Sequence, residues 1–292
     1  MTPSVLSPRT LNGIKHRASQ IVKDEGCTRA HALNLASQLA GAANWNAARR
    51  LIPESMPLAR IEARWVDREN GQQGAEILTY PFPMHVGDMF DPRKAGTRLA
   101  MFYLASPNVL TTKAYGSSQD MARGWAVEAL RALMFIEATG LVPVNRAGLA
   151  YPRKKQTYMG TNFYDAQLIP GQDHVSIWFD PSSKSYLIAD EPYLDETEHR
   201  RAAERAEWCR VNQFTMHRPK WRGMYNPDGG SRIHLFTRNQ SKIDLVDLSH
   251  KIDQLPDDFG FQDWKGASTV GDYPRHLREA PAPLAPNTEQ NL

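Results

Sequence analysis

The residues best placed to do chemistry lie at the two ends of one predicted β-hairpin. Asp173 and His174 precede its first strand, and Asp190 and Glu191 follow its second. Because the open end of a hairpin brings both strand ends together, we expect these four residues to meet. Carboxylates beside an imidazole can hold a divalent metal or act as base and acid. The pattern therefore allows a hydrolase-like site, and it equally allows His174 and Asp190 simply to pair and close the strand ends.

The hairpin that would position these residues is predicted from two runs rich in β-branched and aromatic residues. Val175–Phe179 and Tyr186–Ala189 flank a Pro-Ser-Ser-Lys tetrapeptide at 181–184. Such runs joined by a short turn are typical of a β-hairpin. Alternation makes one face of the first run apolar, so we expect the hairpin to lie inside a sheet.

Motifs for several enzyme classes are missing from the sequence. It has no Gly-rich phosphate loop, no Gly-x-Gly-x-x-Gly, no His-Glu-x-x-His and no Gly-x-Ser-x-Gly. This argues against an ATPase, a Rossmann dehydrogenase, a zincin or an α/β-hydrolase. The two cysteines, Cys27 and Cys209, have no His partner at ligand spacing, so we predict no metal site on them. The sequence identifies no cofactor and no small-molecule ligand.

Composition places the chain among ordinary globular proteins. Its 292 residues are 41% hydrophobic and 23% charged, as is usual for soluble domains. No run of 18 apolar residues is present, so no membrane span is predicted. The N-terminus lacks the basic start and apolar core of a secretory signal. We therefore expect a cytoplasmic protein with no membrane partner.

A basic module is predicted at residues 1–53. This stretch holds seven Lys or Arg residues and two acidic ones, a net charge of +5, whereas the whole chain carries +3. Thr10, Thr28 and Asn44 can each cap a helix. The spacing of apolar residues after each cap predicts three short helices between residues 9 and 52.

Three helices with tight Gly turns form a unit of helix-turn-helix type, which can place one helix in a DNA groove. Such units also serve protein contacts, and a modest positive charge is often just a solvated face. An acidic partner, either nucleic acid or protein, is the functional prediction for this module. The residues expected to contact it are Lys15, Arg17, Arg29, Arg49 and Arg50.

The body, residues 57–277, is predicted to be α+β, with a mostly antiparallel sheet covered by helices. Strands at 58–66, 75–82 and 98–105 are expected to form an antiparallel meander. A long helix is expected between Ser118 and Gly140, with Trp125 in its buried stripe, so that Trp125→Asp should unfold the body.

Further along the chain, the basic run at 151–155 is predicted to be a loop that is solvated or meets a phosphate. A charged helix is expected at 195–214, with a narrow buried stripe of Ala202, Ala206 and Cys209. A strand at 232–237 and a last helix at 242–255 follow. Residues 278–292 have too little apolar content to order and are predicted to be a disordered tail.

Parts of both regions resemble known bacterial sequences. The N-terminal helices resemble a short module of uncharacterised bacterial proteins at Leu11, Ile14, Lys15, Ala18, Ala32, Leu33, Ala36, Ala40, Gly41, Asn44 and Trp45. The chain departs from that module at Arg29 and Ala42. From about Thr10 to Lys251 it resembles a domain-of-unknown-function family found on plasmids and other mobile elements. The matching segments are 138–141, 170–174, 178–181, 190–193 and 221–231.

The family resemblance implies a cytoplasmic bacterial protein accessory to a mobile element, and it implies no activity. Together with the basic module, it predicts a non-enzymatic protein that binds nucleic acid or an acidic protein. The alternative is a hydrolase-like enzyme that uses Asp173, His174, Asp190 and Glu191. A partner-binding scaffold is a third possibility.

Overall fold

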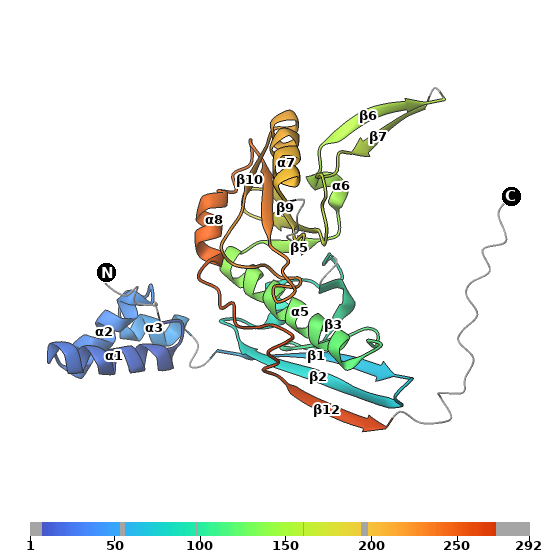
Figure 1. The fold of residues 1–292 in the computed structure, drawn as a ribbon. Helices are drawn as coiled ribbons and strands as arrows, with labels where there is room; N and C mark the ends of the chain where they lie inside the picture. The colour runs from blue at the N-terminus through green and yellow to red at the C-terminus, as the bar shows by residue number, and fades with distance from the viewer. Residues whose placement is uncertain (1–7, 53–55, 97–98, 160, 194–197, 273–292) are drawn as a thin grey trace.

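The protein is an α+β structure with N-terminal helices followed by mostly antiparallel sheets (Figure 1). The computed structural model describes residues 8–52, 56–96, 99–159, 161–193 and 198–272. The helices are α1 Leu11–Glu25, α2 Arg29–Leu39, α3 Trp45–Leu51, α4 Val86–Met89, the 3₁₀ turn η1 Leu99–Met101, α5 Gln119–Thr139, α6 Ala147–Ala150, α7 Glu198–Asn212 and α8 Leu245–Ile252. The strands are β1 Leu58–Asp67, β2 Gln72–Pro81, β3 Phe102–Ser106, β4 Val109–Thr112, β5 Val142–Val144, β6 Arg153–Tyr158, β7 Thr161–Ala166, β8 Ser176–Asp180, β9 Ser185–Asp190, β10 Phe214–His217, β11 His234–Arg238 and β12 Ala267–Asp272.

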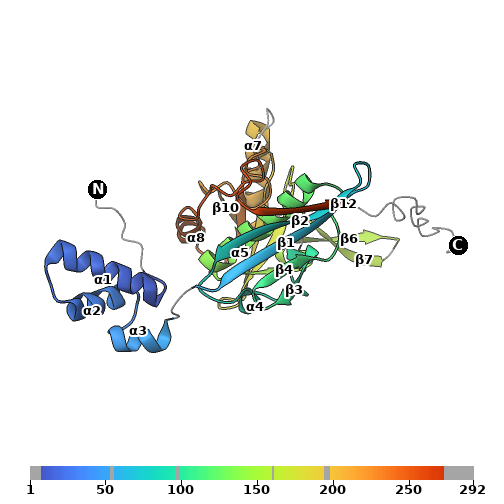
Figure 2. The same ribbon diagram turned by 90° about the horizontal axis from the view of Figure 1, so that it is seen from below.

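Helices α1, α2 and α3 form the helical module with a small core of its own, as the sequence predicts. The side chains of Thr10, Thr28 and Asn44 each accept a hydrogen bond from the first turn of the helix that they precede. Gly26 ends α1 in the left-handed conformation, which glycine adopts without strain. Figures 1 and 2 show the module to one side of the body.

The first sheet of the body, sheet A, has the strand order β12-β2-β1-β4-β3. The predicted meander is wrong, because β4 lies between β1 and β3 and pairs with β1 in parallel. The chain between β2 and β3 buries Val86, Met89, Phe90 and Leu99. Because this segment packs into the core and crosses to the far edge of the sheet, β2 and β3 are not joined by a tight turn as a meander requires. Strand β12, which the sequence analysis missed, is exposed along its length and pairs with β2.

Helix α5 begins at the Ser118 cap and ends at Gly140, as predicted. It packs between sheet A and the second sheet of the body, so almost every side chain from Ala126 to Ile136 is buried. Trp125 is only partly buried at the rim of this core. The prediction of a single buried stripe through Trp125 is therefore wrong, because α5 has a sheet on two of its sides.

The second sheet, sheet B, has the order β10-β11-β9-β8-β5 and contains the predicted hairpin as β8 and β9. Both faces of the hairpin are covered. Trp178 and Leu187 face α5, whereas Ile177 and Ile188 face a second core beneath α7. The central position predicted for this hairpin is confirmed.

Helix α7 packs on sheet B through a different stripe from the predicted one. Ala202 and Ala206 are exposed, and the buried side chains beside Cys209 are Arg205 and Trp208. The predicted stripe contained no charged residue, whereas the buried Arg205 has the buried Asp190 carboxylate as its partner. Residues 195–197 of this predicted helix and the predicted tail at 278–292 lie outside the described residues.

Strands β6 and β7 form a two-stranded ribbon where the sequence analysis predicts a basic loop. Figures 1 and 2 show the ribbon projecting from the body, on the opposite side from the helical module. At its base, the amide of Gln167 donates to the carbonyl of Pro152 (2.8 Å), and Arg238 donates to the carbonyl of Tyr151 (3.0 Å). No helix in the described part of the chain is long and apolar enough to cross a membrane.

Candidate functional site

The two ends of the β8–β9 hairpin meet through their backbone. The amide of Glu191 donates to the carbonyl of Asp173 (2.9 Å), and the amide of Asp173 donates to the Asp190 carboxylate (2.7 Å). The structure thus brings the four residues of the predicted hydrolase-like site into one neighbourhood. What they can do depends on where each side chain points.

The Asp190 carboxylate is buried on the α7 side of sheet B. It accepts a hydrogen bond from Arg205 Nη2 at 2.8 Å, and both side chains are almost completely buried. Arg205 also donates to the carbonyls of Pro170 and Gly171. Burial raises the pKa of Asp190 to about 7, although the Arg205 guanidinium acts in the opposite direction. Asp190 therefore fastens α7 and the 170–173 segment to the end of β9.

The next residue, Glu191, points to the other face of the sheet, as alternation along an extended chain requires. Its Oε2 atom accepts hydrogen bonds from the amides of Met224 (2.5 Å) and Tyr225 (2.7 Å). Gly223 has a φ of +107°, and a Cβ there would lie 2.5 Å from the same Glu191 oxygen. The buried Glu191 carboxylate therefore shapes the 221–231 loop.

Arg131 of α5 stabilises the same loop from the core. It is fully buried and donates to the carbonyls of Gly223 and Phe259 (3.1 Å to the latter) and to the carboxylate of Asp257 (2.6 Å). Its guanidinium lies 4.6 Å from the centre of the Trp221 ring. Burial lowers the pKa of Arg131, and Asp257 counteracts that effect. The sequence analysis missed Arg131 and Arg205, and the only signal for either was a charged residue within a buried helical stripe.

His174 is the fourth predicted residue and is partly exposed. Its Nε2 lies 3.2 Å from the Asp173 carboxylate, and its ring stacks on Tyr225 with centroids 3.4 Å apart. Tyr193 contacts both rings edge-on. Asp173 and His174 thus stay together at the surface, whereas Asp190 and Glu191 are buried on opposite faces. Among the described residues, no group of three His, Cys, Asp or Glu side chains could hold a metal ion.

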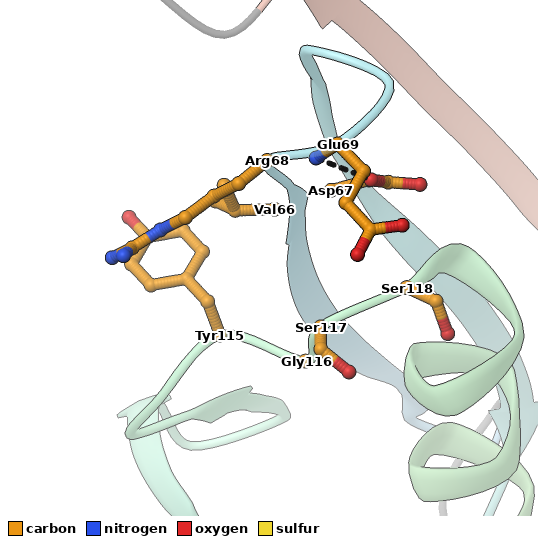
Figure 3. A pocket seen from close by; sticks show the side chains of 8 residues that line it. All are labelled: Val66, Asp67, Arg68, Glu69, Tyr115, Gly116, Ser117 and Ser118. Carbon is orange, nitrogen blue, oxygen red and sulfur yellow. Dashed lines mark hydrogen bonds between the residues drawn. The ribbon is translucent and has the colours of Figure 1, made fainter. Parts of the chain in front are cut away.

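A separate hollow of about 570 Å³ lies between the β1–β2 turn and the segment that leads into α5 (Figure 3). The Asp67 carboxylate there accepts hydrogen bonds from the amides of Glu69 and Asn70 and from the Asn70 side chain. These bonds lower the pKa of Asp67. Figure 3 shows Arg68 and Tyr115 on the opposite side of the hollow from Glu69. The described lining residues include no histidine, and the Asp67 carboxylate stabilises the turn.

The helical module presents a polar face on α3. Asn46, Arg49 and Arg50 are exposed and stand three and four positions apart, which places them on one side of the helix. We call these three residues the α3 face. The guanidinium of Arg50 donates to the carbonyl of Asn46 (3.3 Å), and neither arginine has a carboxylate partner among the described residues.

The other predicted contact residues of the module lie on α1 and at the start of α2. Arg29 joins the two helices by donating to the Ser19 hydroxyl and to the carbonyl of Lys15. Arg17 donates to the Gln20 side chain (3.1 Å), and Lys15 donates to Asn12 (3.3 Å). Arg29 thus has a structural role in the module. In these two bonds Arg17 and Lys15 donate to neutral acceptors.

Comparison with known proteins adds no relative to this picture. No protein-family model matches the chain, and no curated protein and no solved structure matches it significantly. The resemblance to a family of mobile-element proteins stays a prediction, and the function has to be inferred from the geometry.

Proposed function

We propose that this protein binds duplex DNA through its helical module, with the α3 face directed into the major groove. The observation that carries the proposal is the α3 face itself. It combines two exposed arginines with an exposed asparagine on one side of a short helix. Arginine and asparagine are the side chains that most often read guanine and adenine in the major groove.

The arrangement of the helices supports the same proposal. A short third helix follows α2 across a tight turn at Gly41, whose φ is +78°. In helix-turn-helix proteins the second helix of such a pair enters the groove, and neighbouring basic residues contact phosphates. Lys15, Arg17 and Lys23 add positive charge on α1. A net charge of +5 on the first 53 residues, against +3 for the whole chain, gives this module the electrostatic character that DNA attracts.

No observation favours the hydrolase-like alternative. Proton transfer needs the acid and the base within hydrogen-bond reach of one reacting group. Asp190 pairs with Arg205, and Glu191 accepts from two backbone amides on the other face of the sheet. Only Asp173 and His174 remain together at the surface. Their position beside Tyr193 and Tyr225 is explained by packing.

The test is DNA binding by the full chain and by an Arg49→Gln/Arg50→Gln variant, measured by fluorescence anisotropy with a short duplex. We expect the double variant to bind at least about tenfold more weakly, since each good base contact contributes about 1–3 kcal/mol. Where the arginines contact phosphates instead, the dependence of affinity on salt should weaken by about one counterion per arginine.

The control is Arg93→Ala/Lys94→Ala, which removes the same charge from the body. Its two side chains are 89% and 80% exposed and lie outside the module. This variant should bind like the unmodified protein. Equal weakening of both variants would show that net charge alone causes binding. Equal competition by polyglutamate would identify an acidic protein as the better partner. Either result would overturn the proposal.

A further inference from the structure

The described side chains of the β6–β7 ribbon form no hydrophobic core. All of its described side chains except Gln156 are exposed, including Tyr164 (58%), and Met159 at the tip is 88% exposed. A two-stranded hairpin without a packed face is only marginally stable in water. Packing of the described side chains therefore does not explain why the ribbon projects from the body, and a function in binding would.

The two faces of the ribbon differ in charge. Side chains alternate between the faces along a strand, and directly opposed residues share a face. Lys154 is opposite Asp165, so positive and negative charge stand side by side on one face. Arg153 and Lys155 occupy the other face, with Tyr164 opposite Lys155, and no acidic residue joins them there. We call this second side, with Arg153, Lys155 and Tyr164, the cationic face.

We propose that the cationic face of the β6–β7 ribbon is a second contact for duplex DNA, on the sugar–phosphate backbone of the duplex that the helical module binds. This inference rests on the proposed function of the module. The chemistry of the face fits phosphate, because Lys and Arg neutralise phosphates and a tyrosine hydroxyl donates a hydrogen bond to them. A two-stranded ribbon is also narrow enough to lie along the major groove of B-form DNA.

The geometry makes the second contact depend on the length of the duplex. The ribbon and the helical module lie on opposite sides of the body in both views (Figures 1 and 2). A duplex of about one helical turn, roughly 10–12 base pairs, is occupied by a single reading helix. In this proposal a longer duplex reaches both elements at once, and the second contact then forms as an intramolecular step. The ribbon should therefore strengthen binding to long duplexes and leave binding to short ones unchanged.

The chain offers a closely matched pair of variants for the test. Lys154→Ala and Lys155→Ala remove the same charge from adjacent exposed positions of one strand, on opposite faces. Affinities of the full-length protein are measured on duplexes of about 12 and about 40 base pairs at roughly 50 mM salt and upward. On the long duplex, Lys155→Ala should weaken binding about threefold to tenfold and reduce the salt slope by about one. Lys154→Ala should match the unmodified protein, and so should both variants on the short duplex.

The outcomes separate the ribbon from the module. Equal behaviour of Lys154→Ala and Lys155→Ala on the long duplex would overturn the ribbon proposal, since the charges would then only solvate the strands. That result together with strong weakening by Arg49→Gln/Arg50→Gln would leave the module proposal standing. Weakening by Lys155→Ala alone, with no effect of the module variant, would show that the ribbon contacts DNA without the module and would overturn the proposed function. No binding by the unmodified protein would overturn both.

Discussion

Arginines occur in two contrasting settings in this protein, inside the body and on the helical module. Arg131 and Arg205 are buried in the body and donate to carboxylates and backbone carbonyls that lie far away in sequence. Arg49 and Arg50 are exposed on the module and have no carboxylate partner among the described residues. A buried charge must be paired, because losing its hydration is costly. An exposed charge stays hydrated and needs no partner within the fold. The buried arginines therefore stabilise the fold, whereas the exposed ones are available to a binding partner.

The largest expected effect is the loss of stability when the buried Arg205 is removed. Arg205→Ala leaves the Asp190 carboxylate buried without its cation and removes the donor to two carbonyls. Breaking a buried pair in this way typically costs about 3–5 kcal/mol of unfolding free energy. Urea denaturation followed by circular dichroism measures the loss.

Arg210→Ala is the matched control for that measurement. Arg210 lies on the same helix and pairs with Glu207 at 2.6 Å, but both side chains are exposed to solvent. An exposed pair contributes little, so this variant should lose only a small fraction of what Arg205→Ala loses. Similar losses of unfolding free energy for the two variants would mean that burial does not determine how much each arginine contributes to stability.

The next effect is a pH dependence created by Asp190. Burial raises the pKa of Asp190 to about 7 from its ordinary 3.8, so the folded state keeps a proton that the unfolded state releases between those values. Asp190 therefore stabilises the fold less and less as pH rises from about 4 to 7. Asp190→Asn should remove this decline, and the difference in unfolding free energy between variant and unmodified protein should change across that window.

His234 acts in the opposite sense over part of the same range. Burial lowers the pKa of His234 to about 4 from 6.5, so the unfolded state takes up a proton first as the solution is acidified. His234 thus favours the fold more as pH rises from about 4 to 6.5. The unmodified protein should show a shallow profile there, and Asp190→Asn should show a rising one. Parallel profiles would contradict the raised pKa of Asp190.

What could be predicted from sequence follows from how local each signal is. The caps at Thr10, Thr28, Asn44 and Ser118 and the β8–β9 hairpin depend on neighbouring residues, and all were predicted correctly. The parallel pairing of β4 with β1 depends on a crossover that packs into a distant core. No local pattern encodes that pairing.

The candidate site shows the same limit. The open end of the hairpin was predicted to gather Asp173, His174, Asp190 and Glu191, and it does so through the backbone. The roles of the two buried carboxylates depend on partners about 15 and 33 positions away in sequence, Arg205 and Met224. Adjacent residues of a strand point to opposite faces of the sheet. The sequence alone could therefore have predicted that Asp190 and Glu191 face opposite sides.

The smallest effect expected concerns the stability of the module itself. Arg49→Gln/Arg50→Gln should change the unfolding free energy by less than about 0.5 kcal/mol, because exposed side chains without ion-pair partners contribute little to folding. Gln keeps a good helix propensity at both positions, and only a weak interaction with the α3 dipole is lost. Thermal unfolding of the full chain measures this. A clear loss of stability would place these arginines with Arg205 as structural residues, and weaker DNA binding by the variant would then reflect a damaged module instead of a missing contact.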